Sequence, residues 1–447
     1  MNTHSVPPDP KREPTSKVAS ILQRVLKDPT RSVPIQTTED KVDHALEMIR
    51  VLGSAMLESG QATSDVQETM AKVARAYALP EVRIISLPTI FAIQIAGHDR
   101  RMEIGGVSTA GLRLDQIAAL DDLISRATLG IVEPVEILAR MEAIRKSKAR
   151  FGFVLQILGQ MLMTLAIGLL INPAWPAIPA YLALGLIVGL LLSLSNLVPG
   201  LAMVMPVLTA IVVTICGATF LSDATGEIPL RLIAPALVTF LPGLTLTIAA
   251  IELTRDEMIA GSSRLMHGLS QLLLLAFGVV IGIGIVGDVS ATNDVVLNSI
   301  GPWTPLLGIT LLALGYVLAK SAPESAFLWL VLALVLTYGA QRLGMLFVPA
   351  EYSGFFGALL IVPLSRFLAR FKTAPPALVT QLVSFWILVP GSLGFIGFAE
   401  AATGGNQAVT IGVTTAMSLF SIALGILVGS ALLRRSTFSR PLPAGAA

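Results

Sequence analysis

The chain has 447 residues, of which 54% are hydrophobic and 13% are charged, and its mean hydropathy is +0.76. Soluble domains carry about 25% charged residues, so the composition excludes an ordinary soluble protein. Residues 1–150 hold 20 of the 31 lysines and arginines and 19 of the 29 acidic residues. The rest of the chain is nearly free of charge, which predicts a membrane-embedded region.

Other bulk features exclude several kinds of site and partner. The net charge of +2 indicates no acidic partner, and we expect no nucleic acid to bind. Cys216 is the only cysteine, so a disulfide within the chain and a cysteine-based zinc site are excluded. Because the four histidines are scattered, we expect no metal site, and we expect no cofactor.

The N-terminal part of the sequence predicts a flexible tail followed by a small α+β domain. Residues 1–38 are polar and rich in proline, which is typical of a disordered tail. Because they lack the apolar run of a signal peptide, we expect the following domain, residues 39–148, to stay in the cytoplasm. Its periodicity predicts helices at 39–59, 63–78, 114–127 and 135–146, strands at 82–87, 89–96 and 101–104, and a turn at 97–100.

The N-terminal domain carries no motif of an enzyme. It contains no phosphate loop, no Ser/His/Asp arrangement and no metal-ligand spacing. We therefore expect no catalytic residues. A hydrolase remains a rival hypothesis, and a nucleophile–base pair in a cleft of this domain would support it.

Apolar runs of about 17–25 residues repeat from Phe151 onward, and each is long enough to cross roughly 30 Å of hydrocarbon. Three tryptophans near the run ends, Trp175, Trp303 and Trp386, are expected to be interfacial anchors. The sequence predicts ten transmembrane spans, at about 152–171, 177–194, 198–221, 231–253, 265–287, 299–318, 324–340, 344–364, 378–399 and 409–433.

The loops between the predicted spans differ in basic residues. With the N-terminal domain inside, the inner loops and C-terminus hold nine lysines and arginines, whereas the outer ends hold only Arg231 and Arg342. Positively charged loops stay in the cytoplasm. We therefore expect both termini, including the tail 434–447, to be cytoplasmic, and the protein to reside in the inner cell membrane.

An internal repeat relates the two halves of the predicted membrane region. Pro242-Gly243 in span four and Pro390-Gly391 in span nine are each followed by a glutamate nine residues after the glycine. Spans five and ten both contain a GxxxG step. Because five spans separate the copies, they cross in opposite directions. The sequence thus predicts a multi-pass α-helical membrane protein with ten transmembrane helices as a 5+5 inverted repeat, residues 151–287 and 299–433, and an N-terminal cytoplasmic α+β domain.

The two Pro-Gly pairs predict helix breaks near the bilayer midplane. Proline lacks an N–H group and glycine loosens the backbone, so a break there leaves unpaired carbonyls and N–H groups that can bind a small polar solute. A helix N-terminus favours a carboxylate. The alternative is that both pairs are packing kinks. The candidate substrate-binding residues are Pro242, Gly243, Thr245, Thr247, Pro390, Gly391 and Ser392.

The glutamates that follow the breaks are candidates for gating or proton coupling. Glu252 is expected near the inner face and Glu400 near the outer face, where a partly dry carboxyl can hold a proton. Arg264 could neutralise Glu252, and His267, one turn further on, could titrate near neutral pH. The alternative is that both glutamates are solvated helix ends and that His267 is interfacial.

Several segments together resemble the threonine/serine exporter family of bacterial membrane proteins. They are ESGQATSDVQETMAKVARAYAL, GHDRRMEIGG and LDQIAALDDLISRATLGIVEPVEILARMEAI before the first span, and LPGLTLTIAAIELTRDEMIAGSSRLMHG and VPGSLGFIGFAE in spans four and nine. The likeness covers about residues 40–435. Its weight lies in the order of these segments and the ten-span layout, since no single motif is diagnostic.

The resemblance implies export of threonine and serine driven by the proton gradient. The family's Pro-Gly segments, acid and arginine fall here on Pro242-Gly243, Glu252, Arg264 and Pro390-Gly391. After the second Pro-Gly the chain has Ser392-Leu-Gly-Phe, where the family often has longer side chains and a tyrosine. A dicarboxylate exporter of the same architecture therefore stays open. The expected partners are an amino acid, protons and the lipid bilayer, with a homo-oligomer possible; a membrane receptor is a third alternative.

Overall fold

The computed structural model describes residues 38–79, 82–95, 102–108, 111–201, 203–225, 229–287, 300–371, 373–388 and 408–437. The chain divides into two compact units, Met1–His44 and Ala45–Ala447. Several predictions fall outside the described residues: the tail up to residue 37, the turn at 97–100, the C-terminal residues from 438 on, and the candidate site residues Pro390, Gly391, Ser392 and Glu400.

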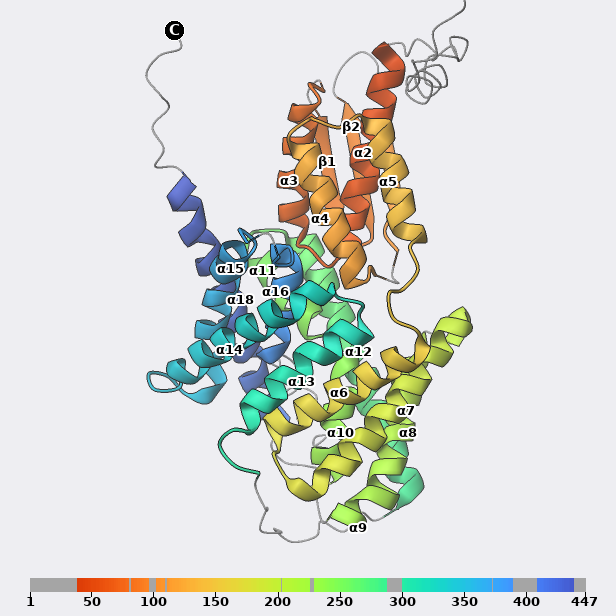
Figure 1. Ribbon diagram of the computed structural model, residues 1–447, viewed down its shortest axis with the longest axis vertical. Coiled ribbons are helices and arrows are strands. Elements are labelled where there is room, and N and C mark those ends of the chain that lie inside the picture. The colour runs from red at the N-terminus through yellow and green to blue at the C-terminus, as the bar shows by residue number, and fades with distance from the viewer. Residues whose placement is uncertain are drawn as a thin grey trace, which may run out of the picture. The chain divides into compact units, whose positions relative to one another are not determined.

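The N-terminal region contains a three-stranded antiparallel sheet with helices before and after it (Figure 1). Strand β2 lies in the centre, with Ala92 opposite Ile85 of β1 and Ile104 of β3. Helix α2 packs on β2 so closely that a Cβ atom at Gly53 would overlap the Phe91 ring. The elements are α2 (Thr38–Glu58), α3 (Thr63–Ala76), β1 (Val82–Leu87), β2 (Ile90–Ile95), β3 (Met102–Gly106), α4 (Leu114–Thr128) and α5 (Pro134–Lys146).

The type and order of these elements confirm the prediction from periodicity. Two helices end where glycine adopts a left-handed conformation, α2 before Gly60 (φ +81°) and α4 before Gly130 (φ +67°). Glycine takes up this conformation without steric cost, so it stops a helix. Proline at the start of α5 is compatible with the first helical turn, where no N–H group is needed.

Apolar helices make up the rest of the described chain, in two successive groups. The first contains α6 (Phe153–Ile171), α7 (Ile178–Leu197), α8 (Met205–Cys216), a π-helical turn at Gly217–Leu221, α9 (Ser222–Thr225), α10 (Pro229–Leu237), α11 (Gly243–Thr254) and α12 (Met258–Val286). The second contains α13 (Thr304–Ala319), α14 (Phe327–Gly344), α15 (Gly354–Leu368), α16 (Ala377–Ile387) and α18 (Ala408–Thr437).

Five of the described helices are long and apolar enough to cross a membrane, and a bent pair of helices makes a sixth candidate. The five are Phe153–Ile171, Trp175–Ser195, Met258–Val286, Phe327–Gly344 and Val413–Leu432, and the bent pair is Arg231–Phe240 with Gly243–Thr254. Three shorter apolar helices are Met205–Leu221, Thr304–Ala319 and Ala377–Ile387. The chain is therefore a multi-pass helical membrane protein.

Helices α8 and α15 start well after the beginning of the predicted spans that contain them. The third span was expected from residue 198, but α8 begins at Met205, after a 3-10 turn at Pro199–Leu201. The eighth was expected from residue 344, but α15 begins at Gly354, after Pro349 and a second 3-10 turn. In both places proline prevents the apolar run from forming one continuous helix. Conversely, α18 continues to Thr437, beyond the expected end at 433.

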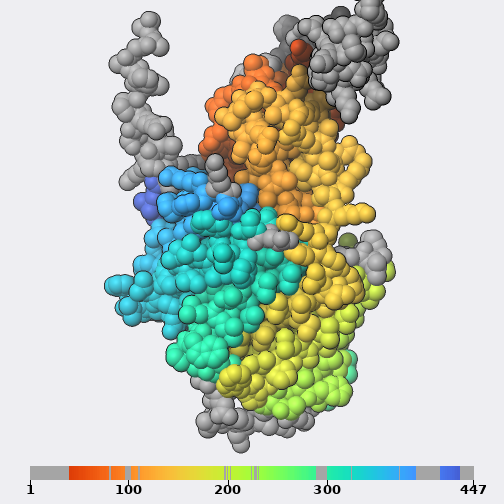
Figure 2. Space-filling view, viewed as in Figure 1, coloured from red at the N-terminus to blue at the C-terminus, as the bar shows by residue number. Residues whose placement is uncertain are grey.

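Helices α6 and α13 lie side by side and run in opposite directions (Figure 1). In the space-filling view, yellow and blue-green segments of the chain adjoin (Figure 2). A Cβ atom at Gly159, in the first half of α6, would lie 2.5 Å from the backbone nitrogen of Ala319, at the end of α13. A Cβ atom at Gly308, near the start of α13, would lie 3.1 Å from the carbonyl oxygen of Ala166, further along α6. Small residues permit this close approach of two backbones.

Both GxxxG steps also lie at helix contacts. Gly278 and Gly282 of α12 face α8, where added Cβ atoms would lie 2.8 Å from the carbonyl oxygen of Val207 and 3.2 Å from that of Ile211. In the second group, Gly425 and Gly429 of α18 approach the carbonyl oxygens of Phe355 and Leu359 on α15 still more closely. The two glycine steps therefore hold the same kind of helix pair in each group.

We expect Gly159→Ala to lower the free energy of unfolding by about 1–3 kcal/mol, because its new methyl group meets backbone atoms that cannot rotate away. Gly284→Ala is the matched control, since Gly284 is an exposed helical glycine with nothing within 4 Å of an added Cβ atom. Alanine there should leave stability unchanged or raise it slightly. Thermal unfolding of the purified proteins in detergent measures both. Equal midpoints for the two variants would contradict the close contact of α6 with α13.

Candidate functional site

The fourth apolar segment is broken where the sequence predicts it. Helix α10 contains Pro235 and ends at Leu237, and a 3-10 turn, Val238–Phe240, follows. Helix α11 then begins at Gly243, directly after Pro242, and the two parts are bent by 60°. Proline cannot donate the helical hydrogen bond and clashes with the preceding turn, so the helix direction changes there. The predicted break at Pro242-Gly243 is confirmed.

The break leaves the N-terminal pole of α11 inside an apolar segment. The N–H group of Leu246 is bonded to the carbonyl oxygen of Pro242 (2.9 Å), which closes the first helical turn. The N–H groups at the start of a helix have no carbonyl partner within it and carry partial positive charge. Because α11 runs for twelve residues, its start can attract an anionic group.

A small cavity of about 10 Å³ lies next to the segment that precedes this break, at Val238 and Thr239. Segments from both groups of helices line it, because α6, α10 and the 3-10 turn come from the first and α13 and α16 from the second. Its lining is mainly apolar, as is usual for a small-molecule site. The lining residues are Met163, Ile167, Pro235, Val238, Thr239, Leu312, Tyr316 and Trp386.

The polar groups at the pocket come from threonine, tyrosine and tryptophan. Gln160 of α6 donates a hydrogen bond from Nε2 to the Thr239 hydroxyl (2.8 Å), so the Thr239 O–H can still donate into the pocket. Tyr316 and Trp386 lie with ring centroids 6.4 Å apart. Trp386 therefore lies at the pocket, and its role as an interfacial anchor stays a prediction.

Several residues that line the pocket form pairs with nearly equal separations along the sequence. Met163 and Leu312 are 149 residues apart, Ile167 and Tyr316 are also 149 apart, and Val238 and Trp386 are 148 apart. The two Pro-Gly pairs have the same separation of 148 residues. The pocket therefore brings together three pairs of residues, one from each group, whose separations are close to that of the two Pro-Gly pairs.

The candidate threonines of α11 differ in their surroundings. Thr247 is completely buried, and its hydroxyl has no hydrogen-bond partner among the described residues. Thr245 is half-buried. Neither lines the pocket, and neither do Pro242 and Gly243, so the structure places these four candidate site residues outside the pocket lining.

Glu252, at the end of α11, is fully buried, so the alternative of a solvated helix end is wrong. Its Oε1 accepts hydrogen bonds from the Thr63 N–H group (2.9 Å) and from the Thr63 hydroxyl (3.0 Å). Its Oε2 lies 3.1 Å from Nε of Arg264. The expected pairing of Glu252 with Arg264 is present, and Thr63 of the N-terminal region is an additional partner.

Two further contacts join the same loops. Arg264 donates a hydrogen bond to the carbonyl oxygen of Gln61 (3.3 Å). Arg255 forms an ion pair with Asp65 (2.6 Å) and donates to the Ser64 hydroxyl (2.9 Å). The turn between α2 and α3 is thus bonded to the turn between α11 and α12.

The structure does not bring His267 into this cluster. It lies one turn after Arg264 on α12, and its side chain is exposed. Among the residues that the structure describes, no group of three or more His, Cys, Asp or Glu could hold a metal ion.

Sequence reasoning missed Gln160, Thr239 and Tyr316 at the pocket, and Thr63, Gln61 and Asp65 at Glu252. Gln160 could have been predicted as a site residue, because an amide within an apolar span needs a polar partner. The contact of Thr63 with Glu252 could not have been predicted, because 189 residues separate them in the sequence.

Comparison with known proteins gives the family. A family model described as "Putative threonine/serine exporter" matches residues 47–286, which is more than half of the chain. The chain is 24% identical over 273 residues to the "Threonine/serine exporter" of Corynebacterium glutamicum, covering 58% of this chain and only 54% of that protein. It is 25% identical over 415 residues to the "Probable threonine/serine exporter" of Mycobacterium tuberculosis, covering 87% of this chain and 77% of the relative.

A fungal protein is also similar. The chain is 26% identical over 244 residues to "Pheromone-regulated membrane protein 10" of Saccharomyces cerevisiae, covering 49% of this chain and 62% of that protein. No solved structure matches. On the match of the family model, the chain belongs to the threonine/serine exporter family, which is a family of transporters and not of enzymes.

Proposed function

We propose that the chain exports small hydroxy amino acids, threonine and serine, across the inner cell membrane as a secondary active transporter driven by the proton gradient. The observation that carries the proposal is the 60° break at Pro242-Gly243, which follows a segment that lines a small cavity together with both groups of helices, in a chain of this family. Transporters built from repeats bind substrate at such broken helices, where the repeats meet.

The proposed architecture is ten spans in two five-span repeats of opposite orientation, residues 151–287 and 299–433. Its main support is the contact between α6 and α13, the first helix of each proposed repeat. A shift of 149 residues carries Gly159 onto Gly308 and Ala166 onto Gly315. If the two helices are exchanged with this shift, the Gly159–Gly315 contact becomes the Gly308–Ala166 contact, and both contacts are present. A two-fold axis between two antiparallel helices produces such a pair of equivalent contacts.

The glycine steps give independent support for the same repeat. Gly278 and Gly425 are 147 residues apart, and the residues that they touch, Val207 and Phe355, are 148 apart. Together with the paired pocket residues, three separate contacts have nearly the same sequence offset. We place the tails, residues 1–38 and 434–447, and the α+β domain, residues 39–148, on the cytoplasmic side, from the distribution of basic residues.

The chemistry of the proposed site suits a small zwitterion with a hydroxyl group. The start of α11 favours the carboxylate of the substrate, and carbonyl groups freed at a break favour its ammonium. Thr239 offers a hydroxyl at the pocket, and Thr245 and Thr247 offer hydroxyls further along α11. We assign the corresponding role in the second repeat to Pro390, Gly391 and Ser392.

Glu252 and Arg264 are the proposed gating and coupling pair of the first repeat, and Glu400 is the counterpart of Glu252. The burial of Glu252 beside Arg264 supports this, because an intramembrane carboxylate with a charged partner is typical of coupling sites. His267 has weaker support, since its exposed side chain lies apart from Glu252.

Counterflow in proteoliposomes tests the function. Purified protein is reconstituted with internal unlabelled threonine, serine, valine or succinate, and uptake of labelled threonine or labelled succinate is followed with and without a pH gradient. Exchange of threonine and serine that increases with the gradient supports the proposal. Exchange of succinate alone would favour the dicarboxylate exporter, and no exchange of any of them would refute both.

We expect Thr239→Val to raise the KM for threonine about three- to tenfold, because the pocket loses a hydroxyl donor and the Gln160 amide loses its partner. The effect on valine exchange, if valine is carried, should be smaller. Thr337→Val is the control, since Thr337 is a buried threonine of an apolar helix, α14, and does not line the pocket. Concentration dependence of counterflow gives both KM values. An unchanged KM in Thr239→Val would remove this residue from the site.

A further inference from the structure

The turn between α2 and α3 is bonded to the far end of the broken span. Glu252, Arg255 and Arg264 contribute from α11, α12 and their connecting turn, and Gln61, Thr63 and Asp65 contribute from the N-terminal region. We call this set of contacts the latch. It lies at the opposite end of α11 from the Pro242-Gly243 break, so the route along α11 from the pocket leads to it.

The centre of the latch is a helix cap supplied across the fold. Thr63 is the first residue of α3, and the preceding N-cap residue, Ala62, has no side chain that can bond the helix start. Glu252 takes this role, because its carboxylate accepts both the Thr63 N–H and the Thr63 hydroxyl. An acidic group at a helix N-terminus also interacts favourably with the helix dipole. The cap therefore joins α3 and α11 by charge-assisted hydrogen bonds.

The same N-terminal region also contacts the second group of helices. The N–H group of Leu114, at the start of α4, donates to the carbonyl oxygen of Lys320 (3.2 Å), between α13 and α14. Helix α4 also packs against α16, and Leu114 and Ile117 belong to the apolar core that contains residues of the membrane helices. This second attachment is mainly apolar.

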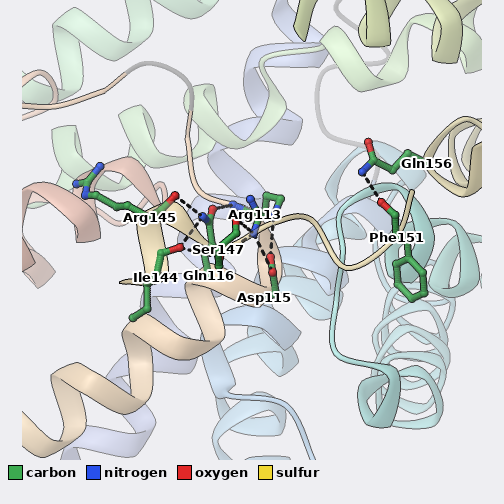
Figure 3. A network of polar contacts seen from close by, with 8 residues as sticks. All are labelled: Arg113, Asp115, Gln116, Ile144, Arg145, Ser147, Phe151 and Gln156. Carbon is green, nitrogen blue, oxygen red and sulfur yellow. Dashed lines mark hydrogen bonds and ion pairs between the residues drawn. The ribbon is translucent and has the colours of Figure 1, made fainter. Parts of the chain in front are cut away.

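A polar network makes the region around Leu114 stiff (Figure 3). Arg113 forms two hydrogen bonds with the Asp115 carboxylate (both 3.0 Å) and one with the Ser147 hydroxyl (2.9 Å). Gln116 donates to the carbonyl oxygen of Ile144 (2.9 Å). The start of α4 and the end of α5 therefore move together.

We infer that the N-terminal domain is a brace that keeps the two repeats from separating on its side of the membrane, and that the bond between Glu252 and Thr63 is the contact that opens. The inference rests on the proposed function in one respect, alternating access by movement of the repeats. A rigid domain attached to both repeats resists that movement, so one attachment must yield. The apolar attachment at Leu114 loses its burial when it opens, whereas the polar groups of the latch can bond water instead.

Accessibility of a buried cysteine tests the latch in the full-length chain. In a Cys216→Ala background, Thr247→Cys is the reporter, because Thr247 is completely buried on α11 between the break and the latch. Thr63→Pro removes both donors to Glu252, yet proline is compatible with the first position of α3. Thr63→Ser keeps both donors and is the matched control. The reaction of each protein with a membrane-impermeant maleimide is timed in lipid nanodiscs.

We expect Thr63→Pro to increase the labelling rate about tenfold over Thr63→Ser, because two hydrogen bonds to a charged group are lost. Thr63→Ala, which loses only the hydroxyl, should give an intermediate rate and replaces the proline variant if that protein is not monodisperse. Rates that agree within about twofold in all three variants, at equal thermal stability, would overturn the latch.

Labelling does not depend on the substrate, so the two proposals can fail separately. Latch-dependent labelling, with no threonine counterflow in the chain that retains Thr247, would retain the brace and refute the exporter. Threonine counterflow with labelling that is insensitive to Thr63 would retain the exporter and refute the brace.

Discussion

Gly243→Leu is expected to abolish threonine counterflow while the protein still inserts into the membrane. Gly243 is buried, begins α11 and follows Pro242 at the 60° bend. A leucine side chain there must occupy space beside the N–H groups that we propose to bind the substrate carboxylate. Because interiors are closely packed, the added carbons also displace neighbouring segments at the break.

The control for this prediction is Gly284→Leu on α12, an exposed glycine with nothing within 4 Å of an added Cβ atom. Counterflow is measured in proteoliposomes that contain equal amounts of each variant, and size-exclusion chromatography establishes that both are folded. We expect a loss of at least about a hundredfold for Gly243→Leu, because misplacement of a binding group by about 1 Å can cost that much in rate. Normal counterflow in Gly243→Leu would remove the substrate from this break.

Glu252→Ala is expected to destabilise the protein by about 3–5 kcal/mol, which is among the largest effects of a single substitution. The change leaves Arg264 without its carboxylate, and it removes the acceptor for both donors of Thr63. Since these groups are buried while the latch is closed, water does not readily replace the lost partner in that arrangement. Thermal or denaturant unfolding in detergent measures the change.

Two controls separate the buried pair from charge effects in general. Asp65→Asn breaks the neighbouring ion pair between Asp65 and Arg255. Because the Asp65 side chain is 50% exposed, this change should lower the free energy of unfolding by only about 0–1 kcal/mol. The double variant with Glu252→Leu and Arg264→Leu lacks both charges. It should therefore regain much of the stability that Glu252→Ala loses. A cost for Glu252→Ala no larger than that for Asp65→Asn would show that Glu252 is solvated and not buried.

Most of the N-terminal fold could be predicted because its signals are local. β-Branched residues predicted β1 and β2, and Gly60 marked the end of α2 through the backbone conformation that glycine permits. The break at Pro242-Gly243 was predictable for the same reason, since the missing N–H group of proline acts on its own helix. Helix starts were less predictable, because proline and 3-10 turns delayed α8 and α15.

The candidate site could be predicted only in part. Glu252 and Arg264 were expected to pair because twelve residues separate them, and both were recognisable as charges in an apolar region. The aromatic residues of the pocket were not expected there. Trp386 was assigned to the interface from its place near a span end, and the structure places it beside Tyr316 through the packing of α16 with α13.

The amino-acid sequence determined the membrane class, the order of helices and strands and the position of the helix break. Each depends on composition or on residues within one turn of each other. Only the tertiary structure decided that Glu252 caps α3, that Gln160 bonds Thr239, and that residues of helices distant in sequence line one pocket. These contacts join residues 79 to 189 positions apart, and they exist only because many apolar contacts first bring the helices together.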